Sequence, residues 1–203
     1  MNDSRVILCT GGIGSGKSCV VQAFRVLGVP AYDCDRSAKE LYDRDARLLA
    51  SVADLAGPGV LDAAGRLDRR ALAGRIFADP ALLDAVEALV HPAVIRDFTA
   101  WKAAQDTALV VIESAILLEK PRFAGLYDTV VTVAAPEDVR IGRVVARDAC
   151  TPAQVRRRMA AQWDDAARAA RADYVLENND RQSMLPAIMD IIEKEKRRWK
   201  RQI

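Results

Sequence analysis

The chain has 203 residues, of which 51% are hydrophobic, enough for one good-sized domain or for a core with inserted subdomains. The net charge of +2 does not require a nucleic-acid partner, and no apolar run reaches the roughly 18 residues that a membrane span needs. The four cysteines lack the spacing of a metal site or a disulfide framework, and the N-terminus has no apolar signal region. We therefore expect a cytoplasmic protein without a membrane or nucleic-acid partner.

Short aliphatic runs alternate with amphipathic stretches along the chain. The runs predict five strands, at residues 5–10, 29–33, 108–113, 129–135 and 173–178. Continuous rather than alternating aliphatic residues are typical of a parallel sheet that is covered on both faces. The pattern predicts an α/β fold with a five-stranded parallel sheet flanked by helices.

The long segment between the second and third strands holds two readable helix signals. Asp79 and Pro80 are typical of a helix cap followed by proline at the first helical position. His91 and Pro92 are expected to break the chain between two helices, because a residue before proline avoids the helical conformation.

The lengths of the connections indicate how the domain is divided. Residues 34–107 are mostly helical and exceed what one crossover helix needs, which predicts an inserted helical subdomain. Residues 137–172 also hold more helix than a minimal crossover, and we refer to them as the lid region. The core would then consist of residues 1–33, 108–136 and 173–203.

A glycine-rich loop separates the first strand from the first helix. Gly11, four further residues and then Gly16-Lys17-Ser18 match the phosphate-loop (P-loop) pattern G-x-x-x-x-G-K-[ST] in the required context. The glycines let backbone amides turn inward, and the helix N-terminus adds its positive end, so a nucleoside triphosphate is expected here. Lys17 should reach the β- and γ-phosphates, and Ser18 should ligate Mg²⁺. The predicted nucleotide-binding residues are Gly12, Ile13, Gly14, Ser15, Gly16, Lys17, Ser18 and Cys19.

Carboxylates follow two of the predicted strands. In an extended chain Asp33 and Asp35 would point to the same side, toward the strand ends where ligands bind. One of them could accept the proton of an attacking hydroxyl, and the alternative is that they cap the next helix. Glu113 could hold Mg²⁺ through water, or it could be a solvated charge at the end of its strand.

Arginines are frequent in the lid region. Guanidinium groups offset the negative charge of a transferring phosphoryl group, although most of these arginines fit a solvated helix face. Arg143 and Arg147 share one helix face, and Arg147 is favoured for function because it ends its helix before a hinge. His91, the single histidine, has no partner residues for a metal site.

Five segments in order resemble the dephospho-coenzyme A kinase family. They are TGGIGSGKS, FRVLGVPAYDCDRSAKEL, GRLDRRALAGRIFADP with VHPAVI, ARDACTPAQVRRRMAAQ, and ADYVLENN. The resemblance implies transfer of the ATP γ-phosphoryl group to the ribose 3′-hydroxyl of dephospho-coenzyme A, the last step of coenzyme A synthesis. It also implies a nucleotide core, a helical acceptor-binding insertion and a mobile lid, with ATP and Mg²⁺ as cofactors.

The resemblance also implies roles for individual residues. Asp35 matches the family's catalytic base and Arg147 its lid arginine, so Asp35, Lys17 and Arg147 are the predicted catalytic residues. The predicted acceptor-binding residues are Asp33, Asp35, Asp68, Arg69, His91 and Pro92. Arg143, Asn178 and Asn179 complete the predicted nucleotide site. Asp68 could instead be a helix cap, and the asparagines could form a turn.

Three positions depart from the family pattern. Cys19 stands where threonine is common, Glu113 where aspartate is common, and Arg140 where glutamine is frequent, so the metal role of Glu113 and the role of Arg140 stay open. Alternative functions are a small P-loop kinase for a nucleotide or sugar-acid acceptor, or a nucleotide-dependent switch protein. The helical insertion favours a kinase with an acceptor pocket. We also expect a monomer or a weak homo-oligomer.

Overall fold

The structure is a computed structural model that describes residues 4–201. The chain forms two compact units, of which one runs up to Asp33 and resumes at Lys102, and the other is Cys34–Trp101. The first unit contains the sheet and the lid region, and the second is helical.

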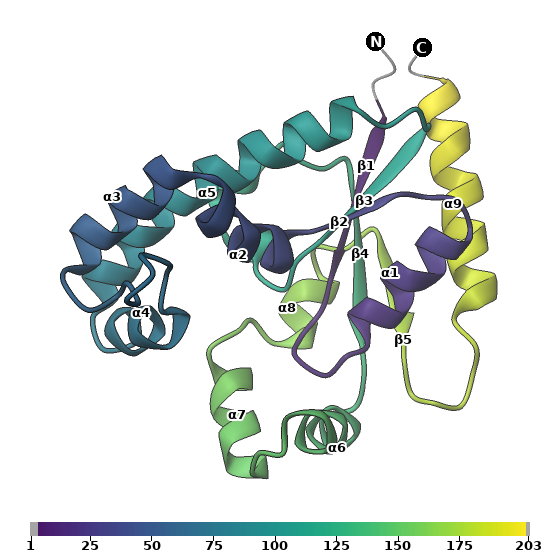
Figure 1. Ribbon diagram of the computed structural model, residues 1–203. Coiled ribbons are helices and arrows are strands. Elements are labelled where there is room, and N and C mark those ends of the chain that lie inside the picture. Colours follow the sequence, from purple (N-terminus) through teal and green to yellow (C-terminus); the bar gives the residue numbers. More distant parts are fainter. Residues whose placement is uncertain (1–3, 202–203) are drawn as a thin grey trace. The chain divides into compact units, whose positions relative to one another are not determined.

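The five predicted strands form one sheet in which all neighbours are parallel, so the predicted fold class is confirmed. The spatial order is β2-β3-β1-β4-β5 (Figure 1). The strands are β1 (Arg5–Thr10), β2 (Ala31–Asp33), β3 (Leu109–Glu113), β4 (Thr129–Ala134) and β5 (Tyr174–Glu177). The carboxyl ends of β1, β2 and β3 meet at one edge, because Glu113 pairs with Cys9 on one side and Asp33 on the other.

Helix α1 (Lys17–Val26) and helix α9 (Leu185–Lys200) pack side by side against one face of the sheet, as Figure 1 shows. Buried residues at helical spacing line both helices, for example Val20 and Phe24 in α1, and Ile188 and Ile192 in α9. Burial of each large aliphatic or aromatic side chain contributes about 1.5–3 kcal/mol, so this layer fixes the direction in which α1 leaves the P-loop.

The lid region contains α6 (Glu137–Asp148), α7 (Pro152–Ala160) and α8 (Asp165–Ala169). Thr151 and Gln154 form a reciprocal capping box that starts α7, with Pro152 at its first position. A small apolar cluster centred on α6 and α7 joins the two helices. Two short 3₁₀ helices, η1 (Leu117–Glu119) and η2 (Pro121–Phe123), follow β3.

The helical unit contains α2 (Cys34–Arg44), α3 (Ala46–Ala56), α4 (Arg69–Ile76) and most of α5 (Pro80–Ala103). The Asp79 carboxylate accepts the amides of residues 81 and 82, which confirms the predicted cap. The predicted break at His91 and Pro92 is wrong, because α5 continues through both. Proline inside a helix costs about 3 kcal/mol, and burial of side chains such as Val86, Val94 and Phe98 offsets that cost.

Candidate active site

The P-loop connects β1 to α1, as the sequence pattern predicts. Gly16 directly precedes the helix in a left-handed conformation with φ of 96°, which favours glycine. A Cβ atom on Gly16 would lie 2.1 Å from Nδ2 of Asn178, so this position also lacks space for a side chain. Lys17 is then the first residue of α1, at the positive end of the helix.

Side chains donate hydrogen bonds to the backbone carbonyl oxygens of three consecutive loop residues. The bonds run from Arg140 Nε to Ile13 (2.9 Å), from Arg143 Nη1 to Gly14 and Ser15 (3.3 Å each), and from Asn178 Nδ2 to Ser15 (2.8 Å). The donors come from α6 and from the residue that follows β5. These bonds hold the loop by its acceptor groups, which leaves its amides to determine what it binds.

The loop amides fall into two groups. Ile13 N donates to Gln162 Oε1 at 3.0 Å, and Ser15 N donates to the Gly12 carbonyl at 3.1 Å. Among residues 13–18, the amides of Gly14, Gly16 and Ser18 have no protein acceptor within the described part of the chain. Amides without protein acceptors in a loop at a helix N-terminus can form an anion-binding site.

The two predicted metal-binding residues lie together. Ser18 Oγ donates a hydrogen bond of 3.1 Å to Glu113 Oε1, although the two residues are 95 positions apart in the sequence. Asp33 is the register partner of Glu113 on the neighbouring strand, so a second carboxylate lies at the same edge of the sheet. Hydroxyl and carboxylate oxygens are the ligands that Mg²⁺ prefers.

The electrostatics of Glu113 also suit a cation. Burial is the largest influence and raises the pKa of Glu113, and the charge of Asp33 raises it further. The Ser18 hydrogen bond and the charges of Lys17 and Arg25 lower the pKa but do not cancel the rise. The ionised carboxylate is therefore incompletely compensated, and a bound cation would favour its charged form.

Few protein groups are available for a metal ion. Among residues 4–201 no cluster of three or more histidine, cysteine, aspartate or glutamate residues could hold one. Burial and the nearby charge of Glu113 raise the pKa of the Cys9 thiol to about 12, despite the opposing charge of Lys17, so this thiol stays protonated. Cys19, next to Ser18, has an exposed side chain. Mg²⁺ is suited to such a site, because it commonly uses one or two protein carboxylates together with phosphate oxygens.

The two favoured lid arginines lie in different surroundings. Arg143 contacts the P-loop carbonyls and pairs with Asp180. Arg147 forms two hydrogen bonds to the neighbouring Asp148, of 2.7 and 3.1 Å, and its side chain is 63% exposed. The hydrogen bond from Arg147, with another from Arg158, lowers the pKa of Asp148 to about 2 despite the opposing effect of burial. In this structure the Nε and Nη2 groups of Arg147 are directed to Asp148 rather than to the P-loop.

The two asparagines after β5 also differ. The Asn178 side chain supports the P-loop through Ser15. Asn179 Oδ1 accepts the amide of Arg181 at 3.1 Å, which is the turn geometry considered as the alternative.

The expected parallel orientation of Asp33 and Asp35 is wrong. Asp33 is the last residue of β2, but α2 begins at Cys34 and places Asp35 in its first turn. The strand periodicity of two therefore ends at Asp33. An acidic residue in the first turn interacts favourably with the helix dipole, which explains why the helix begins this early. The Asp35 side chain is exposed.

Within the helical unit, the predicted acceptor-site residues have clear structural contacts. Asp68 caps α4 by accepting the amides of residues 70 and 71, both at 3.0 Å, so the cap alternative is confirmed. Arg69 donates to the Lys39 carbonyl and to Asp43 Oδ2, also at 3.0 Å. His91 is 7% exposed, and Pro92 follows it inside α5.

Several polar residues around the P-loop have no role predicted from the sequence. Arg140 and Gln162 bind Ile13, and Arg140 also pairs with Asp165 at 2.8 Å. Arg168 of α8 is fully buried and pairs with Glu119 at 2.7 Å. Only the unusual arginine at position 140 gave a signal, since the remaining partners lie outside any local pattern.

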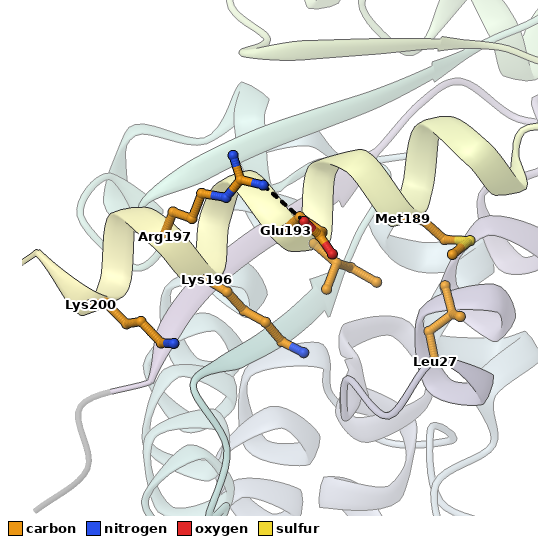
Figure 2. A pocket seen from close by; sticks show the side chains of 7 residues that line it. Leu27, Met189, Glu193, Lys196, Arg197 and Lys200 are labelled. Atoms are coloured by element: carbon orange, nitrogen blue, oxygen red, sulfur yellow. Dashed lines mark hydrogen bonds and ion pairs between the residues drawn. The ribbon is translucent and has the colours of Figure 1, made fainter.

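A groove lies at the other end of α1, beside Leu27 (Figure 2). Its volume is about 340 Å³, and it lies where the end of α1 meets α9. It is lined by Leu27, Met189, Ile192, Glu193, Lys196, Arg197 and Lys200. Ten helical residues span about 15 Å, so α1 separates this groove from Lys17.

Comparison with known proteins identifies the family. A model of the dephospho-CoA kinase family matches residues 5–183. The curated dephospho-CoA kinase of Porphyromonas gingivalis is 39% identical over 185 residues, 91% of each chain. That of Anaeromyxobacter dehalogenans is 42% identical over 177 residues, covering 86% of this chain and 83% of its own.

The solved structure of TT1252 from Thermus thermophilus is similar throughout. It superimposes with a TM-score of 0.81 at 35% identity and covers 94% of this chain and 97% of its own. Within residues 4–201 no helix is both long and apolar enough to cross a membrane. The P-loop, the parallel sheet and the match over residues 5–183 together show that this chain belongs to the dephospho-CoA kinase family.

Proposed function

We propose that the P-loop binds the triphosphate of ATP and that the chain transfers its γ-phosphoryl group to the ribose 3′-hydroxyl of dephospho-CoA, giving CoA and ADP. The observation that carries this proposal is the arrangement of the P-loop. Its carbonyls at residues 13–15 are bound by side chains, while the amides of Gly14, Gly16 and Ser18 have no acceptor within residues 4–201. The choice of dephospho-CoA as the acceptor is based on the family to which the chain belongs.

The loop and Lys17 supply the positive potential for the reaction. The remaining amides of residues 12–19 and the Lys17 ammonium would bind the β- and γ-phosphate oxygens, on which negative charge is concentrated during transfer. Arg143 would extend this positive surface from α6, and Arg147 would join it on leaving Asp148. Asn178 and Asn179 would lie beside the adenine.

Asp35 would act as the general base. Its carboxylate would take the proton of the acceptor 3′-hydroxyl as the new O–P bond forms. The bond between the γ-phosphorus and the β–γ bridging oxygen breaks, and ADP leaves with that electron pair. Asp33, Asp68, Arg69, His91 and Pro92 would help to bind the acceptor, either directly or by shaping the helical unit.

The residues fit Mg²⁺ as the cofactor. Ser18 Oγ and the Glu113 carboxylate would hold it, since they lie 3.1 Å apart and the pKa of Glu113 indicates an incompletely compensated charge. When bound, the ion would neutralise charge on the β- and γ-phosphates. We further propose a cytoplasmic enzyme that is a monomer or a weak homo-oligomer.

The direct test is product formation. The purified protein is incubated with MgATP and dephospho-CoA, and CoA and ADP are measured by chromatography. We expect equal amounts of both products, and nucleoside monophosphates or shikimate should replace dephospho-CoA poorly. ATP hydrolysis without CoA formation would favour the switch alternative and contradict the proposal.

A further inference from the structure

Ile13 contacts the lid region through its amide, its carbonyl and its side chain. Its carbonyl accepts Nε of Arg140 at 2.9 Å, and its amide donates to Oε1 of Gln162 at 3.0 Å. Its side chain packs against the apolar cluster of α6 and α7. A single loop residue therefore uses its donor, its acceptor and its side chain to contact the lid region.

The partners of Ile13 are themselves fixed. Gln162 lies in the short segment between α7 and α8, and its own amide donates to the Met159 carbonyl at 3.1 Å in the last turn of α7. Arg140 is 6% exposed and pairs with Asp165, the first residue of α8, at 2.8 Å. Both contacts with Ile13 therefore converge on the junction of α7 and α8.

The contact with Gln162 determines which loop amides can meet a ligand. A hydrogen bond to Gln162 directs the Ile13 amide to the lid region, whereas the amides of Gly14, Gly16 and Ser18 have no protein acceptor within residues 4–201. The Ile13 amide belongs to the Gly12–Ile13 peptide, and the Gly14 amide belongs to the next peptide, which carries the Ile13 carbonyl. Release of the Ile13 amide would therefore loosen the peptide that directly precedes the one presenting the Gly14 amide.

We propose that Gln162 is a positioning residue of the nucleotide site. Its side-chain oxygen holds the Ile13 peptide so that the following amides face the triphosphate. The inference rests on the proposed function, because it assumes that the P-loop binds ATP. Gln162 itself does not touch the phosphates in this scheme, so its effect on ATP passes through Ile13.

Gln154 provides a matched control within the lid region. Its Oε1 also accepts a backbone amide, that of Thr151 at 2.8 Å, but this bond caps α7 and does not reach the P-loop. Gln162→Met and Gln154→Met therefore remove the same kind of bond from the same region. Gln162 borders a cavity of about 480 Å³, so methionine can be accommodated there.

The experiment measures MgATP binding by calorimetry and amide exchange by NMR in the full chain. Gln162→Met is expected to weaken MgATP binding about 2- to 12-fold, the equivalent of one net hydrogen bond, and to speed exchange of the Ile13 amide. The KM for dephospho-CoA should stay unchanged. Gln162→Glu keeps an acceptor oxygen and should preserve slow exchange at Ile13, and Gln154→Met should preserve both exchange and binding.

The outcomes separate this inference from the proposed function. Equal MgATP affinity of Gln162→Met and Gln154→Met would overturn the role of Gln162. In the unaltered protein, exchange at Ile13 as fast as at Gly14 and Gly16 would overturn it too, and this comparison decides the matter if Gln162→Met does not fold. Failure of the unaltered protein to bind MgATP would instead contradict the proposed function.

Discussion

Two glutamates, one near the amino ends of the strands and one at their carboxyl ends, have very different hydrogen-bonding environments. Glu195 of α9 is fully buried near the amino ends of the strands. It accepts hydrogen bonds from Arg5 Nε (2.6 Å), Thr129 Oγ1 (2.7 Å), Tyr174 OH (2.8 Å) and Arg198 Nη1 (2.8 Å). Glu113 ends β3 at the carboxyl edge, is half-buried, and accepts a hydrogen bond from Ser18.

The pKa values of the two groups move in opposite directions. Burial raises the pKa of Glu195, but hydrogen bonds from Arg5, Thr129 and Tyr174 outweigh it, so the pKa lies below its usual value. For Glu113, burial prevails and the pKa lies above its usual value. A buried carboxylate with a full set of donors stabilises the fold, whereas one with few donors is suited to binding a cation. Substitutions at the two edges should therefore differ in what they damage.

The largest effect is expected from Asp35→Asn. Removal of a general base lowers the rate about 10²–10⁴-fold, and we expect this loss in kcat with nearly unchanged MgATP affinity and melting temperature. Steady-state kinetics and calorimetry test both points, with Asp33→Asn as the comparison. A severe loss in Asp33→Asn with a mild one in Asp35→Asn would reverse the assigned roles.

Glu195→Gln should damage stability rather than chemistry. The charge of Arg5, whose side chain is 10% exposed, would lose its buried partner, and such a loss costs about 3–5 kcal/mol. Urea unfolding measures this cost, and kcat of the protein that remains folded should match that of the unaltered chain. A stable variant with low kcat would contradict the structural role of Glu195.

Lys17→Ala should lower catalytic activity with little effect on stability, which is the reverse of the effect expected for Glu195→Gln. Removing one charge that stabilises the transition state lowers kcat/KM about 10²–10³-fold, and a half-exposed lysine contributes little to stability. Turnover and thermal melting are measured on the same sample. Near-normal turnover would contradict the role of Lys17 in phosphate binding.

Glu113→Gln tests the proposed metal site. Loss of a metal-binding or metal-orienting carboxylate lowers affinity or activity about 10–100-fold, so more Mg²⁺ should be needed for half-maximal rate. A Mg²⁺ titration of the initial rate measures this shift, with the exposed Glu193→Gln as the control. An unchanged Mg²⁺ dependence would show that Glu113 does not bind the ion.

The smallest effect concerns pH. The raised pKa of Glu113 contributes stability below its unfolded value of 4.5 that is lost as pH rises through the folded pKa. The lowered pKa of Glu195 contributes stability above 4.5 that is lost as pH falls through the folded pKa. From about pH 4 to about pH 7, Glu113→Gln should thus gain stability relative to the unaltered chain and Glu195→Gln should lose it. Urea unfolding across this range checks the two slopes, and slopes of equal sign would contradict the comparison.

Local signals in the sequence predicted much of the fold. The continuous aliphatic runs predicted the five strands, because the strands of a parallel sheet are buried on both faces and are therefore aliphatic along their length. The glycine-rich pattern gave the P-loop, because its chemistry lies in consecutive residues. The hydrogen bond between Ser18 and Glu113 was not predicted, although both residues were separate candidates for binding Mg²⁺.

The remaining features depend on contacts between distant residues. Arg140 and Gln162 meet Ile13 across 127 and 149 positions, so no local pattern indicates these contacts, although Arg140 was noted as a departure from the family pattern. The continuation of α5 through Pro92 depends on its buried side chains rather than on the local preference of proline. The early start of α2 was missed because the two-residue strand pattern was extended beyond Asp33.

The most direct measurement is a crystal structure of the chain with Mg²⁺ and a non-hydrolysable ATP analogue. We predict that β-phosphate oxygens lie within hydrogen-bonding distance of the amides of Gly14 and Gly16 and of the Lys17 ammonium. The ion should lie beside Ser18. A triphosphate bound elsewhere, with the loop amides turned to protein acceptors, would contradict the account.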